Sequence, residues 1–166
     1  MTPAQALIDR RRFLMGSAFL VAAAPGLASA ASDPYAGDKW RQLADADWKQ
    51  RLPEASYEVL RREATERPFT SPLLKEHRKG TFVCAGCGLA LFKSDWKYDS
   101  GTGWPSFYTE IKGALGKKND FKIGYLRTEY HCARCLGHQG HVFNDGPRPT
   151  GLRYCNNGVA LKFVEA

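Results

Sequence analysis

The cysteines of this chain divide into two matched pairs and one residue that stands alone. Cys84 and Cys87 form one C-x-x-C pair, Cys132 and Cys135 form a second, and Cys155 has no partner at this spacing. Two such pairs are the usual way to present four thiolates tetrahedrally to zinc, because a tight turn points both sulfurs inward. The four paired cysteines therefore predict a closed structural site for one Zn²⁺ per chain.

Two other interpretations of the paired cysteines have to be weighed. Each pair could form a disulfide, or one pair could be a redox C-x-x-C of the thioredoxin kind. A redox motif normally occurs once and beside a βαβ pattern, whereas this chain carries two pairs, with Gly86 and Gly88 at the first. We favour zinc, which leaves these four thiols without a role in catalysis.

Cys155 lies in a segment that concentrates reactive side chains. Residues 131–163 hold three of the five cysteines and three of the four histidines. In an extended strand side chains alternate, so Arg153 shares a face with Cys155, and its guanidinium favours the thiolate. His138 and His141 could supply a proton donor and a second polar contact if the chain folds back over this strand. From spacing alone, a buried structural cysteine stays an open alternative.

The segments around these residues predict a mainly β domain. Short strands are expected at residues 81–83, 89–92, 121–128 and 151–164, and a lysine-bearing loop at residues 113–119. Asn157 and Gly158 stand between two strand-like runs, which predicts a hairpin turn. We expect two antiparallel sheets packed together, with short N-terminal helices and zinc at one end.

Helical patterns precede the strands. Apolar residues recur near helical spacing in residues 39–51, and residues 53–63 begin with Pro-Glu and continue in the same way. Ser71 and Pro72 open a short helical turn that Gly80 is expected to close. His77 lies far from the other histidines in the sequence, so we expect it at the surface.

Three motifs give the chain a family resemblance. They are GTGWPSF at residues 101–107, HQGHVF at 138–143 and RYCNNG at 153–158, in this order between and after the two C-x-x-C pairs. Together they resemble the methionine sulfoxide reductase B family, whose members reduce the R epimer of methionine sulfoxide. The resemblance covers residues 52–164, and several motifs in register are far more specific than any one alone. It implies a twisted, tent-like β fold.

The resemblance implies a role for each reactive side chain. Cys155 would attack the sulfoxide as a thiolate, helped by Arg153, and be left as a sulfenic acid. One of His138 and His141 would protonate the departing oxygen, while Asn157 and the other histidine hold the polar side of the site. The sequence does not say which histidine is the acid.

Two residues of the first motif, Trp104 and Thr102, concern the binding of the substrate and the kind of reductant. An indole in a strand-turn region is more often part of a core, but the glycines and proline around Trp104 favour a rigid loop that walls a pocket. The resemblance implies that Trp104 packs against the methyl group of the sulfoxide. Many members of the family carry a second cysteine at the position of Thr102, and this chain has no spare cysteine. We therefore expect an external thiol, either a thioredoxin-like protein or a small molecule, to reduce Cys155.

Residues 1–30 resemble an export signal. They contain a basic cluster at 10–12, an apolar run from Phe13 and an A-x-A sequence at 28–30. The apolar run is too short and too rich in Gly, Ala and Pro for a stable membrane span. The cluster followed by Phe-Leu resembles a twin-arginine signal, although Asp9 stands where Ser or Thr is usual. We expect export to the periplasm, with residues 31–51 as an approach and helix and residues 52–166 as the reductase domain.

The charge of the chain points to no special partner. Residues 1–30 carry three arginines and one aspartate, so their removal lowers the formal net charge from +7 to +5. Basic clusters such as Arg61 and Arg62 are more often a solvated helix face than a nucleic-acid site. We expect a monomer with two partners, an oxidised protein or peptide and a thiol reductant, without nucleic acid and without stable membrane insertion after cleavage.

Two other functions remain open from the sequence. A zinc-stabilised binding module without catalysis would use the same four paired cysteines, but it gives no reason for Cys155 beside Arg153. A different thiol enzyme, such as a hydrolase, would accept Cys155 with His141 and should act on acyl substrates.

Overall fold

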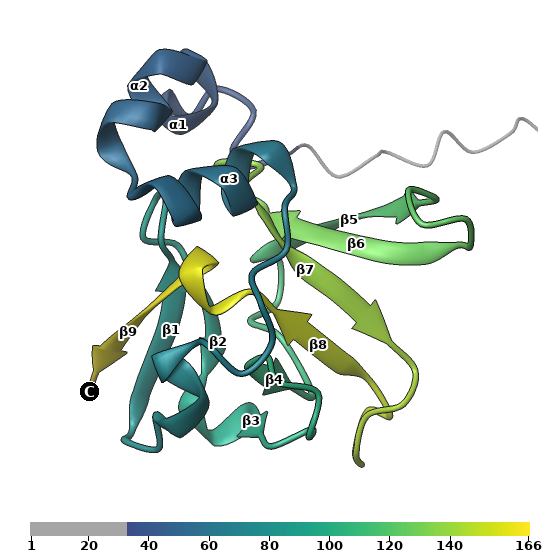
Figure 1. Ribbon diagram of the computed structural model, residues 1–166. Coiled ribbons are helices and arrows are strands. Elements are labelled where there is room, and N and C mark those ends of the chain that lie inside the picture. Colours follow the sequence, from purple (N-terminus) through teal and green to yellow (C-terminus); the bar gives the residue numbers. More distant parts are fainter. Residues whose placement is uncertain (1–32) are drawn as a thin grey trace, which may run out of the picture. The chain divides into compact units, whose positions relative to one another are not determined.

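Three short helices begin the part of the chain that the structure describes. The computed structural model describes residues 33–166, and its first elements are α1 (Lys39–Gln42), α2 (Asp45–Arg51) and α3 (Glu54–Arg62) (Figure 1). The single helix expected over residues 39–51 is broken because Leu43 and Ala44 are extended. The Asp47 carboxylate accepts the Ala44 N–H at 3.0 Å, which caps the start of α2. The export signal predicted for residues 1–30 lies outside the described residues.

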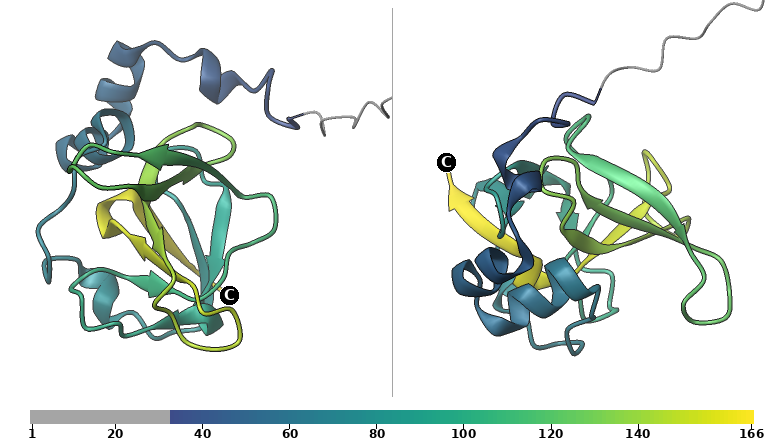
Figure 2. Two further views of the ribbon diagram at one scale, coloured as in Figure 1. Left: turned by 90° about the vertical axis from the view of Figure 1, so that its right-hand side faces the viewer. Right: turned by 90° about the horizontal axis from the view of Figure 1, so that it is seen from above.

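The strands of the described chain form two antiparallel sheets, as the sequence predicts (Figures 1 and 2). The three-stranded sheet has the order β2-β1-β9 and the six-stranded sheet the order β3-β4-β8-β7-β6-β5. The strands of the smaller sheet are β1 (Gly80–Cys84), β2 (Ala90–Lys93) and β9 (Leu161–Glu165). Those of the larger are β3 (Lys97–Tyr98), β4 (Ser106–Phe107), β5 (Leu115–Asp120), β6 (Arg127–Cys132), β7 (His138–Phe143) and β8 (Arg153–Asn156).

Short 3₁₀ helices connect these elements: η1 (Pro72–Lys75), η2 (Ser94–Trp96) and η3 (Gly158–Ala160). The Ser71 hydroxyl accepts the Leu73 N–H at 3.2 Å and caps η1. The prediction that Gly80 closes this turn is wrong, because η1 ends before Glu76 and Gly80 is the first residue of β1. Gly80 is needed there because a side chain would meet the Val164 carbonyl of β9. His77 is exposed, as predicted.

The β5–β6 region differs from the sequence prediction. The loop expected at residues 113–119 is mostly strand β5, and most of the strand expected at 121–128 is a turn before β6. β5 is an edge strand, and its Lys117 and Lys118 are exposed. Lysines on an edge strand discourage pairing with other chains, so this strand lacks the apolar pattern by which strands are recognised.

The predicted hairpin at Asn157 and Gly158 is also wrong. β8 and β9 belong to different sheets, and η3 lies between them. Asn157 has a φ of −66°, whereas the two-residue hairpin turn favoured by Asn-Gly needs positive φ at both residues. The chain instead crosses here from the larger sheet to the smaller.

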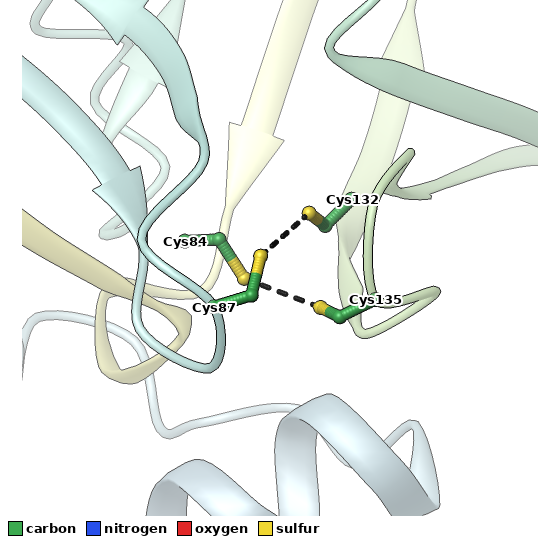
Figure 3. A group of neighbouring side chains, drawn as sticks. All are labelled: Cys84, Cys87, Cys132 and Cys135. Atoms are coloured by element: carbon green, nitrogen blue, oxygen red, sulfur yellow. Dashed lines mark hydrogen bonds between the residues drawn. The ribbon is translucent and has the colours of Figure 1, made fainter. Parts of the chain in front are cut away.

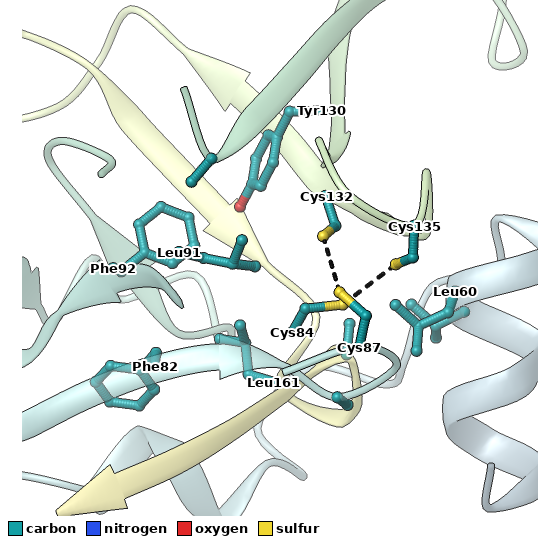
Figure 4. Packing of buried hydrophobic residues seen from close by; sticks show 14 of the residues in the cluster. Leu60, Phe82, Cys84, Cys87, Leu91, Phe92, Tyr130, Cys132, Cys135 and Leu161 are labelled. Atoms are coloured by element: carbon teal, nitrogen blue, oxygen red, sulfur yellow. Dashed lines mark hydrogen bonds between the residues drawn. The ribbon is translucent and has the colours of Figure 1, made fainter. Parts of the chain in front are cut away.

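The core between the two sheets is aromatic (Figure 4). Phe92 of the smaller sheet stacks on Phe107 of the larger with ring centroids 4.2 Å apart, and Phe82 meets Phe107 at 5.0 Å. The rings of Tyr130 and Tyr154, whose centroids are 5.4 Å apart, complete the group. Such pairs stabilise the fold beyond their buried area. No helix among residues 33–166 is long and apolar enough to cross a membrane.

Candidate functional site

The four paired cysteines form one buried cluster (Figure 3). Their Sγ atoms lie within 4.8 Å of one another, with Cys84 and Cys135 3.6 Å apart and Cys87 and Cys132 3.4 Å apart. Tetrahedral zinc with bonds of about 2.3 Å places its sulfurs about 3.8 Å apart, whereas a disulfide needs about 2.05 Å. All four are free thiols, so the cluster could hold a metal ion and its donor set fits zinc.

The two turns of the cluster have the same geometry. The Gly88 N–H donates to the Cys84 carbonyl at 2.8 Å, and the Leu136 N–H donates to the Cys132 carbonyl at 2.9 Å. Both donors have positive φ, 73° for Gly88 and 61° for Leu136, so the glycine expected at the first turn is replaced by a leucine at the second. The Gln139 amide donates to the Cys84 Sγ at 3.4 Å, a contact that favours a thiolate.

The cluster also joins the two sheets. Cys84 ends β1 and Cys87 lies in the turn that leads to β2, while Cys132 ends β6 and Cys135 lies in the turn that leads to β7. Figure 4 places the sulfurs beside Leu60 of α3 and next to the core residues Leu91 and Leu161. A metal held here would cross-link distant parts of one domain.

Cys155 lies elsewhere, in the middle of the larger sheet. On β8 it pairs with His141 of β7 on one side and Ser106 of β4 on the other. It lines a cavity of about 120 Å³ together with Thr65, Trp104, Arg127, Gly140, His141, Phe143, Asn156 and Asn157. The structure thus brings four of the predicted site residues, Cys155, His141, Trp104 and Asn157, to one cavity.

Arg153 and Thr102 approach Cys155 from outside the cavity wall. The Arg153 Nε and Nη2 atoms donate to the Asp145 carboxylate at 2.8 and 2.9 Å, and the guanidinium lies 4.3 Å from the centre of the Phe143 ring. The Thr102 Oγ1 is 4.0 Å from the Cys155 Sγ. Burial raises the pKa of the Cys155 thiol, while the Arg153 charge acts in the opposite direction without cancelling the effect of burial.

A β-bulge decides where the two predicted histidines face. In the β6–β7 pairing, His131 lies opposite His138 and Tyr130 opposite Gly140, so Gln139 is an extra residue. His138 and His141 therefore share a face, with ring centroids 5.5 Å apart, although simple alternation would separate them. His141 reaches the cavity, and His138 is buried behind it.

Each of these histidines is held by a carboxylate. The His141 Nε2 lies 2.7 Å from the Asp120 Oδ2, and the His138 Nδ1 lies 2.7 Å from the Glu129 Oε1. Burial acts to raise the pKa of Glu129, but hydrogen bonds from His131 and His138 outweigh it and hold the pKa at about 2. Burial lowers the pKa of His141 and Asp120 opposes this only in part, so the ring is neutral at neutral pH.

Trp104 and Asn157 are positioned by one segment after α3. The Trp104 Nε1 donates to the Glu66 carbonyl at 3.1 Å. The Asn157 Oδ1 accepts the Glu66 N–H at 3.0 Å, and its Nδ2 donates to the Gln139 carbonyl at 3.0 Å. The Glu66 carboxylate in turn accepts the backbone N–H groups of Gly158 and Val159. Asn157 therefore has one amide N–H left for a substrate. Its other side-chain hydrogen bonds connect the segment after α3 to strand β7.

Most of the described chain matches a known protein family. The SelR domain family model matches residues 52–165. Peptide methionine sulfoxide reductase MsrB of Leptospira interrogans is 56% identical over 121 residues, which cover 72% of this chain and 92% of that protein. Proteins of the same name from Bradyrhizobium diazoefficiens and Agrobacterium fabrum are 52% and 50% identical, each over 72% of this chain and over 86% and 90% of their own lengths. The chain belongs to the methionine sulfoxide reductase B family.

Sequence reasoning missed several residues of this reductase site. Asp120 and Glu129, which hold the two histidines, and Arg127, which lines the cavity, were not among the predicted residues. Asp120 and Arg127 flank the turn at residues 121–126, so a correct assignment of that turn would have drawn attention to them. Glu66 gave no signal, because its contacts come from backbone groups far away in the sequence.

The charges around Cys155 predict how its ionisation responds to substitution. Because the folded-state pKa is raised, its thiolate fraction at neutral pH is below that of an ordinary cysteine and grows as the pH rises. Replacing Arg153 by Met should raise the pKa further, and replacing Asp145 by Asn should lower it, since Asp145 acts to raise it.

The measurement is the rate of alkylation of Cys155 by iodoacetamide as a function of pH, located by peptide mass spectrometry. A small cysteine peptide provides the reference. The pH at which the alkylation rate is half-maximal should be higher for Cys155 than for the peptide. A lower value, or shifts of the two variants in the same direction, would contradict this assignment of charges.

Proposed function

We propose that this protein reduces the R epimer of methionine sulfoxide in oxidised peptides and proteins to methionine, with Cys155 as the nucleophile. One observation carries the proposal: Cys155 opens on a cavity the size of one side chain, opposite a neutral histidine and a fixed indole. The family supports it, because its curated members are peptide methionine sulfoxide reductases. The reaction repairs oxidised proteins.

The reaction needs a nucleophile and a proton donor together. A sulfoxide sulfur is electrophilic, but its oxygen leaves poorly unless it is protonated. Cys155 transfers its thiol proton to His141 and attacks, and His141 passes the proton to the sulfoxide oxygen. In sum the S–O bond of the sulfoxide breaks and an S–O bond to Cys155 forms. Methionine leaves reduced by two electrons, and Cys155 is left oxidised as a sulfenic acid.

His141 is the better placed of the two histidines for this proton transfer. It pairs directly with Cys155 across the strands and lines the cavity, whereas His138 is buried and does not. An ionised Asp120 accepts the Nε2 proton of His141, which leaves Nδ1 to receive the thiol proton. Arg127 adds a positive charge to the wall where oxygen carries negative charge in the transition state.

The apolar side of the cavity selects the methyl group. Trp104 and Phe143 are its aromatic walls, and the Trp104 ring is held by the Glu66 carbonyl. With the methyl group against the indole and the oxygen toward His141 and Arg127, only one epimer presents its sulfur to Cys155. Such an arrangement would make the site selective for one epimer, and the family resemblance indicates that this is the R form.

An external thiol completes the cycle. Thr102, whose Oγ1 lies 4.0 Å from the Cys155 Sγ, stands where many members of the family carry a second cysteine, and the remaining cysteines form the buried cluster. No resolving cysteine is therefore available among residues 33–166. Two equivalents of a small thiol, or a thioredoxin-like protein, reduce the sulfenic acid and release one water and one disulfide.

The other parts of the proposal concern the metal and the location. Cys84, Cys87, Cys132 and Cys135 would hold one Zn²⁺, which would supply a structural cross-link and take no part in the redox step. Residues 1–30 act as a twin-arginine signal for export to the periplasm, followed by an approach at 31–51 and the reductase domain at 52–166. The mature protein works as a monomer.

Single-turnover reduction of separated epimers tests the activity. Protein lacking residues 1–30 and loaded with zinc is mixed with R or S methionine sulfoxide peptide, without reductant. About one methionine per chain is expected from the R epimer and none from the S epimer. Absence of product from both would refute the reductase and favour a zinc-stabilised binding module.

Mass spectrometry of the same reaction tests the intermediate. A sulfenic acid trapped by dimedone is expected on Cys155, and a disulfide between Cys155 and another cysteine of the chain would refute the external-thiol route. Thr102→Cys is the matched contrast. Its new thiol lies where Thr102 now approaches Cys155, so a disulfide between residues 102 and 155 should replace the sulfenic acid.

A further inference from the structure

A second apolar surface lies beside the cavity, in the turn between β5 and β6. Residues 121–126, the hairpin tip, carry four large apolar side chains that are more than half exposed: Phe121 at 65%, Ile123 at 52%, Tyr125 at 59% and Leu126 at 55%. Single exposed apolar residues are ordinary on protein surfaces. Four within one short turn form a patch, and such patches mark binding surfaces.

The hairpin tip is continuous with the cavity. Asp120, directly before it, holds His141 at 2.7 Å, and Arg127, directly after it, lines the cavity with Cys155. Arg127 and Asp120 are joined by an ion pair of 2.5 Å, which closes the base of the turn. Figures 1 and 2 show the hairpin extending from this base beyond the rest of the sheet.

The charges of the hairpin are compensated. Lys118 and Lys122 both form ion pairs with Glu63, the residue that ends α3, and the Lys118 Nζ lies 2.7 Å from it. Arg127 is paired with Asp120. The surface that the hairpin tip offers to a partner is therefore apolar and not cationic. Thr65, two residues after Glu63, lines the cavity, so the same ion pairs connect the hairpin to the segment that forms this part of the cavity wall.

The size of the cavity determines what else must be bound. A volume of about 120 Å³ accommodates one side chain, so the residues on either side of a methionine sulfoxide must lie on the rim. We propose that the hairpin tip binds apolar side chains flanking the sulfoxide in an extended polypeptide. This rests on the proposed function and narrows its substrate class. Methionine is most often buried among apolar neighbours, and oxidation to the polar sulfoxide disrupts such packing.

Peptides that differ only in their flanking residues test the proposal. The substrates are an R-sulfoxide peptide with leucines on both sides, the same peptide with serines, and N-acetyl-methionine R-sulfoxide, all with dithiothreitol as reductant. Burial of one or two apolar side chains on the tip predicts a kcat/KM about tenfold higher for the leucine peptide. Combined replacement of Phe121, Ile123 and Tyr125 by Ser should remove this preference. The rate on the N-acetyl compound, which has no flanking residues to touch the tip, should change less than about twofold.

A matched control is Val164→Ser on β9, because Val164 is 52% exposed on the other sheet. This variant should keep the full preference for the leucine peptide. Equal kcat/KM for the two peptides, or a preference that survives the triple replacement, would overturn the proposal. If the protein forms a concentration-dependent dimer that the triple replacement converts to a monomer, and the preference for the leucine peptide does not change, a second copy of the chain occupies the tip. Failure of the unaltered protein on all three substrates would instead refute the proposed function.

Glu63→Gln examines the charge compensation separately. It leaves Lys118 and Lys122 without their acceptor, so a peptide with aspartates beside the sulfoxide should gain several-fold in kcat/KM, and the gain should disappear at high salt. An unchanged rate on this peptide would show that the ion pairs do not set the specificity.

Discussion

Replacing Cys155 by serine should abolish reduction of R-methionine sulfoxide. A serine hydroxyl is not ionised near neutral pH, so it does not attack the sulfoxide sulfur. It also cannot take up the sulfoxide oxygen as a thiol does when it forms a sulfenic acid, so the intermediate is lost as well. We expect a fall in kcat/KM of at least about 1000-fold, the size seen when a catalytic nucleophile is removed. The measurement is turnover with dithiothreitol, alongside thermal unfolding of the same sample.

The fold of this variant should be preserved. Cys155 is only half-buried and lies outside the four-cysteine cluster, so the exchange of sulfur for oxygen should change the unfolding free energy by no more than about 1 kcal/mol. Binding of the sulfoxide peptide, followed by isothermal titration calorimetry, should persist. If the variant still reduces the sulfoxide, Cys155 is excluded as the nucleophile. If the variant neither folds nor binds the peptide, its loss of activity gives no support for a catalytic role of Cys155.

Much of the architecture could be predicted from the sequence, because it follows from short apolar strands and paired cysteines. The two antiparallel sheets, the short N-terminal helices and the single cysteine cluster are confirmed. The errors fall where tertiary context decides. β5 carries exposed lysines because it is an edge strand, and the turn at Asn157 passes from one sheet to the other.

The candidate site was predictable in its residue types but not in its geometry. The motifs singled out Cys155, His141 and Trp104, and the structure places them at one cavity. That His138 and His141 share a face depends on the bulge at Gln139, which period-two alternation cannot reveal. The pKa of Cys155 is likewise raised by burial, which depends on the folded chain. The sequence showed only that Arg153 lies near Cys155, and Arg153 acts to lower this pKa.

Removing the Zn²⁺ that we propose for the four paired cysteines should unfold the domain. The cluster connects the β1–β2 turn of one sheet to the β6–β7 turn of the other. Structural zinc in small domains contributes about 10–16 kcal/mol of apparent binding free energy, comparable to or larger than the 5–15 kcal/mol that stabilises a typical domain. Cys132→Ser should therefore give a chain without bound zinc and without a cooperative thermal transition. The readouts are zinc content per chain by elemental analysis and circular dichroism during heating.

The stability that bound zinc provides should depend on pH. Zinc binds thiolates, so protons compete with the metal and acidification should release it. In a strong chelator, unfolding should accelerate as the pH falls, while Cys155→Ser, whose cluster is intact, should follow the unaltered protein. The aromatic core should not compensate for the loss, because Phe92 and Phe107 pack between the same two sheets that the cluster connects. A Cys132→Ser protein that melts cooperatively at the original temperature would show that the sheets are held together by this packing alone, and the four thiols would then need another explanation.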